Sequence, residues 1–400
     1  MRHKRPESIT AGRDEMRYLI PVALSYDIEK GEWIIGNDAL DYGAETGASV
    51  YGDFLTNTLG GGNAVVGNSE FSYMQLFAVY LGKLIELVQK ASAVQTVSNI
   101  TVTLRRIRPD IKEAFIDVFS LLGVNEDRLK LLSYSESFAY FAMSSDAELR
   151  KNGVLLFDFS TDGFFVKQLH DAGEADRELI YINESMHSFD FSMKDLTSSM
   201  AKLQLDDKLN TAYEEISKDK IPSSVYFAGD GFTEIWFANT LQNISQKTKA
   251  YKGNNIYVKG ACLAGCRRYA KQPDLLLVSK DRTKARIAVD AFQGSQEKRI
   301  VLADGAKSWF DASCSIDFIV DNLTWIKFYV TSVVTKDTTV IEFDLGDFPK
   351  RPNKTTRIRI ALNFINDSEC ELSVSDRGFG EMFPPSDMEV KKRISLERII

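Results

Sequence analysis

The sequence predicts a mixed α/β region over residues 1–270, followed by an antiparallel β-sandwich over residues 271–400. In the first region, apolar runs of strand length alternate with longer segments of helical period, which is typical of α/β domains. In the second, short runs of alternating apolar and polar residues are separated by polar turns, which favours an antiparallel sandwich. A third observation is the stretch 223–241, SSVYFAGDGFTEIWFANTL, where a strand pattern changes to a helical one at two glycines.

This stretch has the form of a ligand-binding turn. Residues 225–228 are apolar and rich in β-branched and aromatic side chains, as in a buried strand. The pattern stops at Gly229, Asp230 and Gly231, and glycines permit tight turns and close backbone approach. Apolar residues three or four positions apart then predict a helix over residues 235–241. Strand, glycine turn and helix is how α/β sheets bind ligands at helix N-termini, although a plain turn explains the same residues.

Composition and charge exclude several classes of protein. The chain has 400 residues, 44% hydrophobic and 26% charged, which fits a globular protein of two or three domains. No apolar run approaches the roughly 18–20 residues of a membrane span, and the basic start leads into no signal-peptide core, so we expect a cytoplasmic protein without a membrane partner. Residues 271–400 hold 20 basic and 20 acidic residues, so the net charge of −7 lies in residues 1–270. This acidic first region argues against nucleic acid as a partner.

The elements of the first region follow from periodicity, helix-start signals and turns. A hairpin is expected from strands at residues 18–26 and 32–35. The glycines at 60–62 favour a flexible hairpin tip over a phosphate loop, because no long apolar strand precedes them and the Lys-Ser/Thr pair of a P-loop is missing. Other predicted elements are helices at residues 37–45, 71–91, 109–122, 135–143, 193–215 and after Gly260, strands at 97–104, 129–133 and 225–228, and a two-stranded hairpin at 154–169.

The second region is predicted to contain only strands. They are expected at residues 275–278, 285–290, 298–302, 315–320, 326–334, 338–345, 355–364 and 370–375. The loop 376–385, DRGFGEMFPP, is expected to pack on its own sandwich, and a peptide-binding lip is the alternative. The four cysteines show no CxxC spacing, and Cys262 with Cys266 are expected to be buried thiols on one helix face.

Two carboxylates in the first region are candidates for a metal-binding or catalytic role. Asp158 ends an apolar strand before a short turn, where a carboxylate can hold a hydrated magnesium ion or orient a water. Its simpler role is a side-chain-to-backbone bond within the turn. Glu136 lies at a strand-to-helix junction, where its simpler role is a favourable interaction with the helix N-terminus.

The order of these elements resembles the actin-like ATPase superfamily, a duplicated fold related to ribonuclease H, and looks most like the DnaK-type heat-shock chaperones. The resemblance rests on the segments 97–143, 154–169, 225–241 and 253–265 (GNNIYVKGACLAG), and on IPVALSYDIEKGEWIIGND near the start. The C-terminal run LSVSDRGFGEMFPPS and the overall order are closer still to a bacterial family of DnaK-like proteins of unknown function. The resemblance covers nearly the whole chain.

The resemblance implies a nucleotide site. Asp158 and Glu136 fall where the chaperones carry catalytic, magnesium-linked carboxylates. Ser160, Thr161 and Gly163 fall in the second phosphate loop, and Gly229, Asp230 and Gly231 fall on the adenosine motif. The implied cofactor is ATP or ADP with Mg²⁺, and the sandwich resembles the domain that holds a protein or peptide client.

Departures from the family pattern bear on catalysis. Residues 1–17 contain no strand ending in the first phosphate loop, so the fold is predicted to be N-terminally incomplete and the strand at 18–26 to have an open edge. The second loop has lost its glycines, and Asp162 adds a negative charge near the expected phosphate. No lysine stands in an evident position to bridge the β- and γ-phosphates.

These observations predict a chaperone-like or regulatory protein that binds adenine nucleotide and hydrolyses ATP weakly or not at all. The alternative is a scaffold that binds no nucleotide. It would hold a protein partner through the sandwich or through the cleft that holds nucleotide in the resembled family. An actin-like filament former is a weaker alternative, because the polymer would have to accommodate the C-terminal sandwich.

Overall fold

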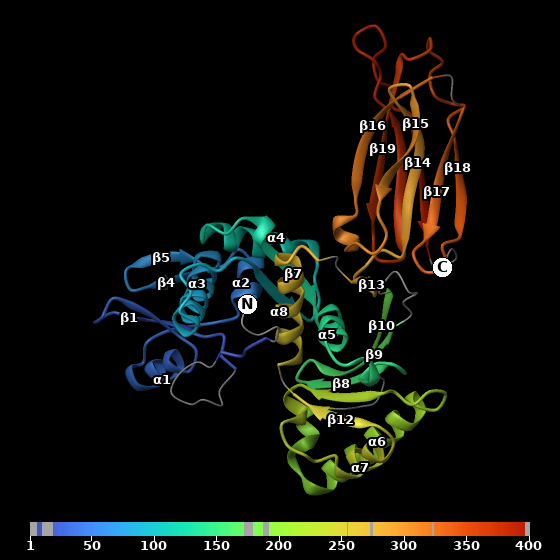
Figure 1. The fold of residues 1–400 in the computed structure, drawn as a ribbon. Coiled ribbons are helices and arrows are strands. Elements are labelled where there is room, and N and C mark those ends of the chain that lie inside the picture. Colours follow the sequence, from blue (N-terminus) through green and yellow to red (C-terminus); the bar gives the residue numbers. More distant parts are fainter. Residues whose placement is uncertain are drawn as a thin grey trace. The chain divides into compact units, whose positions relative to one another are not determined.

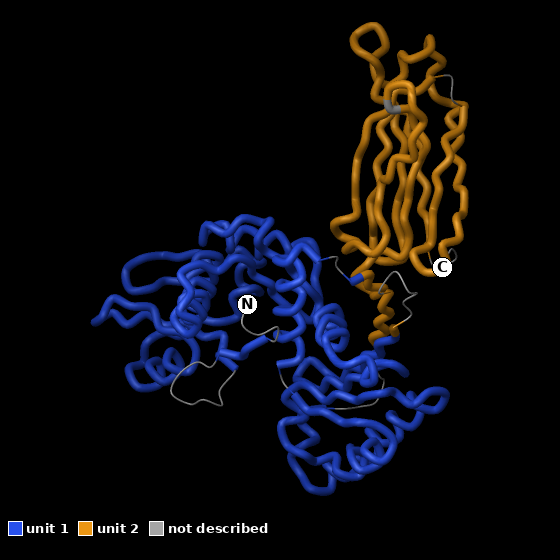
Figure 2. Tube along the Cα trace, viewed as in Figure 1, with its two compact units in different colours: residues 1–170, 185–275 blue, residues 171–184, 276–400 orange. Residues whose placement is uncertain are grey.

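The computed structural model describes residues 6–9, 19–171, 179–186, 192–253, 255–272, 275–321 and 324–396. It is a mixed α/β protein with several sheets and a C-terminal antiparallel region (Figure 1). The chain divides into two compact units, residues 1–170 with 185–275 and residues 171–184 with 276–400 (Figure 2). In the described part of the chain, no helix has both the length and the apolar character needed to cross a bilayer.

A four-stranded portion of sheet organises the second half of the first unit. The antiparallel hairpin of β8 (Val154–Ser160) and β9 (Gly163–Asp171) continues, by parallel pairing, into β11 (Ser224–Ala228) and β12 (Lys249–Lys252). Side chains alternate across these strands, and one face joins the helices α6 (Ser199–Ile216) and α7 (Ala238–Lys247) in an aromatic core. The opposite face meets helix α5 (Tyr134–Met143), whose Phe138 and Phe141 rings pack edge-on against Tyr226.

The helices α5 and α8 (Ile256–Tyr269) pack closely against each other. A Cβ added to Gly260 of α8 would lie 1.8 Å from the carbonyl oxygen of Ser137 in α5, so only glycine permits this contact. A helix was predicted after Gly260, but α8 begins at Ile256, four residues before Gly260, which therefore lies inside the helix. Cys262 and Cys266 are exposed on this helix, so the expectation of buried thiols is wrong.

The first half of the first unit contains short sheets and, in the residues described, four helices, three of which share one core with the strands. Its elements are α1 (Asn37–Thr46), α2 (Phe54–Leu59), α3 (Tyr73–Ser92), α4 (Pro109–Leu121), the sheet β2 (Glu32–Ile35), β1 (Leu24–Asp27) and β3 (Val50–Tyr51), the hairpin β4 (Asn63–Val66) and β5 (Ser69–Ser72), and the parallel pair β6 (Ile100–Leu104) and β7 (Leu129–Ser133). Helix α3 starts with a capping box of Ser72 and Gln75, and α4 starts with a proline.

Three expectations for the first unit are corrected. The strand expected at residues 18–26 is the shorter β1, and its edge is partly covered, because Leu24 and Ser25 pair with β3 on the side opposite β2. The glycines at 60–62 connect α2 to β4 and are not a hairpin tip. The helix expected over residues 235–241 begins only at Ala238; the turn is a short 3₁₀ helix at Asp230–Phe232.

The second unit holds two four-stranded antiparallel sheets on one hydrophobic core, which confirms the antiparallel region. Its strands are β14 (Ala285–Gln293), β15 (Gln296–Ala303), β16 (Cys314–Val320), β17 (Trp325–Ser332), β18 (Thr338–Asp344), β19 (Thr356–Phe364), β20 (Glu369–Asp376) and β21 (Glu389–Ser395). The sheet orders are β15-β14-β17-β18 and β16-β19-β20-β21. The segment expected as a first sandwich strand, β13 (Leu276–Val278), instead pairs in parallel with β10 (Leu179–Met186).

Candidate functional site

The β8–β9 hairpin presents a buried carboxylate to the helices α5 and α8. Asp158 pairs with Phe165 across the hairpin, and Ser160 pairs with Gly163 at its end, so Thr161 and Asp162 form the turn. Asp158 is 1% exposed, whereas its neighbours Phe157 and Phe159 point into the aromatic core. Strand alternation therefore places Asp158 on the opposite face of the sheet, which meets α5.

Arg105 follows β6 and binds this hairpin at three points. Its Nη1 donates to Asp158 Oδ2 at 3.1 Å, its Nη2 to Ser160 Oγ at 2.9 Å, and its Nε to Asp162 Oδ2 at 2.8 Å. The guanidinium carbon lies 5.1 Å from the centre of the Tyr134 ring and 4.4 Å from that of Phe165. The guanidinium thus lies between two aromatic rings, where cation–π attraction adds to the ion pairs.

A tyrosine from α8 completes the contacts of the carboxylate. Tyr257 Oη donates to Asp158 Oδ2 at 2.7 Å, and its ring stacks on Tyr134 at 4.1 Å. The fully buried Lys167, on β9, has its Nζ 5.6 Å from the Phe165 ring centre and 5.9 Å from that of Tyr257. Leu156 pairs with Lys167 as Asp158 does with Phe165, so Lys167 and Asp158 share one face of the sheet.

These contacts define the Arg105 cluster, made of Arg105, Tyr134, Asp158, Ser160, Asp162, Phe165, Lys167 and Tyr257. Burial alone would lower the pKa of the Arg105 guanidinium, but Asp158 and Asp162 raise it overall. Burial raises the pKa of Tyr134, while the Arg105 charge opposes that rise. The charges of Asp158, Asp162 and Asp230 also raise the Tyr134 pKa.

Glu136 caps α5. Its Oε2 accepts a hydrogen bond at 3.0 Å from the backbone N–H of Ser133, while Ser133 Oγ accepts one at 3.2 Å from the N–H of Glu136. This reciprocal pair is a capping box that satisfies two helix-start amides. The carboxylate is 1% exposed, so the structure gives it the helix-start role that the sequence offered as the simpler one.

The glycine turn packs tightly on β8. Gly229 has a φ of +93°, and an added Cβ would lie 2.2 Å from the Phe159 carbonyl oxygen and 3.0 Å from Asp158 Oδ1. A Cβ on Gly231 would lie 2.3 Å from the Phe159 ring. These glycines are required by contact with the neighbouring strand, whether or not a ligand also approaches them.

The residues present do not fit the magnesium ion implied by the resemblance. Asp158 Oδ2 already accepts from Arg105 and Tyr257, and a dication at this carboxylate would face the guanidinium charge. Glu136 binds the backbone of its own helix start. Across the described residues, no group of three or more His, Cys, Asp or Glu side chains is placed to hold a metal ion.

Three residues of the Arg105 cluster were not expected from the sequence: Arg105, Lys167 and Tyr257. Arg105 and Tyr257 contact Asp158 from positions 53 and 99 residues away, so local sequence spacing does not predict these contacts. Lys167 had a signal, because it is the charged residue in the apolar strand run FFVKQL, and a lysine is rarely buried without a specific environment.

Fold and site together define a two-unit protein, an α/β unit built around an internal arginine–aspartate cluster and an antiparallel β-unit. Residues 5–279 match the family model described as Family of unknown function (DUF5716) C-terminal, and residues 282–396 match Domain of unknown function (DUF8552). The first match covers more than half of the chain, so the chain belongs to that family. No curated protein matches it.

Proposed function

We propose that this chain is a regulatory, DnaK-like member of the actin-like superfamily that binds adenine nucleotide and does not hydrolyse it. The order of elements supports the proposal. A parallel pair, β6 and β7, leads into α5; a β8–β9 hairpin carries Asp158; β11 runs parallel to β8 and ends in a glycine turn; and α8 packs on α5. The glycine turn also packs on the strand that carries Asp158, because a Cβ on Gly229 would lie 3.0 Å from Asp158 Oδ1.

The observation that carries the proposal is the ion pair between Arg105 and Asp158. Phosphoryl transfer depends on cations and donors placed around the phosphate, and a carboxylate that holds an internal arginine cannot also hold the metal. Arg105 pairs with both Asp158 and Asp162, so a guanidinium rather than a metal ion offsets these carboxylates. A phosphate at this site therefore binds through the remaining donors of Arg105, without magnesium.

Arg105 retains the capacity to bind an anion. A guanidinium has five N–H groups, and the contacts to the hairpin use three nitrogens once each. Within the described residues this leaves two N–H groups for a phosphate oxygen. Its side chain is 18% exposed, so the group is partly open to solvent. Nucleotide binding in this account depends on Arg105 and is independent of Mg²⁺.

Isothermal titration calorimetry with ATP and ADP tests the proposal, in excess Mg²⁺ and again in EDTA. We expect equal affinity in both buffers, with binding weakened about tenfold or more in Arg105→Gln. Arg108→Gln is the matched control, because Arg108 lies three residues away and, among the described residues, forms its ion pair with Asp110 at the surface. Absence of heat with either nucleotide in the folded protein would remove the nucleotide proposal.

A scaffold without nucleotide is the second candidate, and the packing of the glycine turn favours it. Gly229 and Gly231 lie against Phe159 with no room for a side chain, so their contacts have a purely structural explanation. In that case Arg105 joins the two halves of the first unit, and Arg105→Gln lowers stability without any nucleotide effect. Thermal unfolding of this variant, with and without ATP, separates the two candidates, because only a binding protein is stabilised by the ligand.

A further inference from the structure

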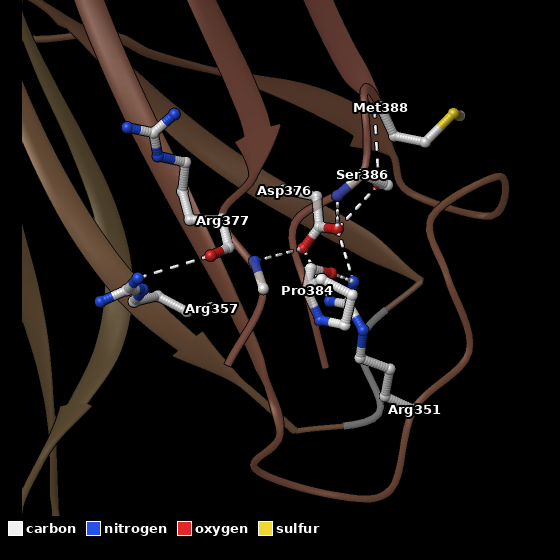
Figure 3. A network of polar contacts seen from close by, with 8 residues as sticks. Arg351, Arg357, Asp376, Arg377, Pro384, Ser386 and Met388 are labelled. Atoms are coloured by element: carbon white, nitrogen blue, oxygen red, sulfur yellow. Dashed lines mark hydrogen bonds and ion pairs between the residues drawn. The ribbon is translucent and has the colours of Figure 1, made fainter. Parts of the chain in front are cut away.

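The loop of residues 377–388, between β20 and β21, is fixed at its base by a buried ion pair. Asp376 ends β20 and is 3% exposed, and its carboxylate accepts two hydrogen bonds from Arg351, each 2.7 Å long. The backbone N–H of Gly378 donates to it at 3.0 Å and that of Ser386 at 2.9 Å. One side chain therefore binds both ends of the loop (Figure 3), which is preorganised before any partner arrives.

The far part of this loop folds back on itself. Gly378 has a φ of +61°, and an added Cβ would lie 2.4 Å from the Phe383 carbonyl oxygen. The N–H of Phe379 donates to that same oxygen at 2.6 Å, which closes residues 379–383 into a tip. On the tip, Met382 is 85% exposed and Phe379 is 41% exposed. A fixed backbone that holds large apolar side chains out to solvent is typical of an interaction site.

The tip borders a hollow of about 650 Å³. Residues 379–383 line it, together with Thr355 and Arg357 at the start of β19. Phenylalanine supplies a flat apolar wall, and methionine adapts to different side-chain shapes. The hollow is therefore suited to a large aromatic or aliphatic side chain.

Arg357 lines the hollow, the exposed Arg377 is its neighbour, and neither forms a close ion pair in the described part of the chain. The N–H of Arg377 donates to the Arg357 carbonyl at 2.8 Å, which places the two residues side by side, and both are exposed. In the described part of the chain, neither guanidinium has a carboxylate within 4.0 Å. Asp317 forms its close ion pair with Nε and Nη2 of Arg359, two residues along β19. The Arg359 hydrogen bond lowers the pKa of Asp317, and the charges of Arg357 and Arg377 lower it further. Exposed arginines without a close ion pair, next to an apolar hollow, are complementary to carboxylates.

We propose that this tip docks an acidic segment of a partner protein, which inserts a large apolar side chain into the hollow and pairs its carboxylates with Arg357 and Arg377. Charge complementarity selects this occupant, because the exposed Arg357 and Arg377 lack close ion pairs. An anionic membrane is attracted by clusters of four to eight basic residues, a larger set than the Arg357 that lines the hollow and its neighbour Arg377. The proposal does not rest on nucleotide binding in the first unit.

A library of random 12-residue peptides displayed on phage and selected on the full chain tests this surface. We expect the recovered peptides to carry Asp or Glu on either side of an aromatic or aliphatic residue. Synthetic copies should bind the wild type in fluorescence anisotropy and bind Met382→Glu or Arg357→Glu at least about tenfold more weakly. Both substitutions leave Asp376 and Arg351 in place, and circular dichroism checks that the variants fold.

Matched controls are available on the other sheet. Phe292, on β14, is 73% exposed, and Lys327, on β17, is exposed as well, so Phe292→Glu and Lys327→Glu repeat the same chemical changes away from the tip. The controls should bind the peptides as the wild type does. Recovery of no peptides, of basic peptides, or of peptides that bind all variants equally would overturn the proposal. Binding to phosphatidylserine vesicles that is lost in Arg357→Glu, without peptide binding, would do the same.

Discussion

Asp376→Asn should destabilise the second unit by about 3–5 kcal/mol, the usual cost of breaking a buried ion pair from one side. The side chains of Asp376 and Arg351 are 0% and 7% exposed, so the arginine would keep its charge where water cannot compensate for the lost partner. The carboxylate also accepts from Ser386 Oγ at 2.7 Å and from two backbone N–H groups of the loop. The new amide would present its NH₂ group to some of these donors, so the loop should loosen with the pair.

Asp317→Asn is the matched control, because Asp317 and Arg359 make the same two-nitrogen contact, at 2.7 and 3.1 Å, on the surface. Their side chains are 32% and 40% exposed, so the expected cost is only about 0.2–1 kcal/mol. Hydrogen exchange measured by mass spectrometry on peptides from β19 to β21 gives both free energies without interference from the first unit. Equal costs for the two substitutions would refute the argument from burial.

Further predictions concern the glycine turn, acid stability and the Arg105 cluster. Gly229→Ala should cost about 1–3 kcal/mol more than Gly47→Ala in urea unfolding, because both have positive φ but only Gly229 would also clash with a backbone carbonyl. Burial would raise the pKa of Asp376, but its hydrogen bonds lower the pKa overall. The stabilisation by the ionised Asp376 is therefore present above the unfolded pKa of about 3.9 and is lost as pH falls. The difference in unfolding free energy between wild type and Asp376→Asn should shrink in acid. Arg105→Ala should lower the free energy of unfolding by about 3–5 kcal/mol, because it leaves the charge of Asp158, 2% exposed, without its partner. Adding Asp158→Asn should restore part of this loss. Strictly additive losses in the double mutant would contradict the coupling between the two residues.

Elements with strong local signals were predictable. Helix α4 begins at Pro109 as expected, the 154–169 hairpin forms at the predicted place, and the eight strands of the sandwich lie close to their alternating runs with one exception. The exception, β21, reads as polar because Lys391, Lys392 and Arg393 interrupt its alternation. It is an edge strand, and charged residues are common there because they prevent pairing with other chains.

Elements that depend on tertiary contacts were not predictable. The apolar spacing of residues 235–241 has a helical period, yet Trp236 Nε1 donates to the Gly231 carbonyl at 2.6 Å and its ring packs into the aromatic core, so the helix starts later. The candidate site has the same character. Asp158 was identifiable from its place at a strand end, whereas its partners Arg105 and Tyr257 come from distant segments that only the fold brings together.

Native mass spectrometry of the full chain with ATP tests the central claim most directly, because the mass of the complex reports the nucleotide, its phosphates and any metal at once. The account predicts one ATP per chain with no magnesium, in EDTA as well as in Mg²⁺, and the same mass after hours of incubation. A complex that forms only with magnesium, or that converts from ATP to ADP with time, would contradict it.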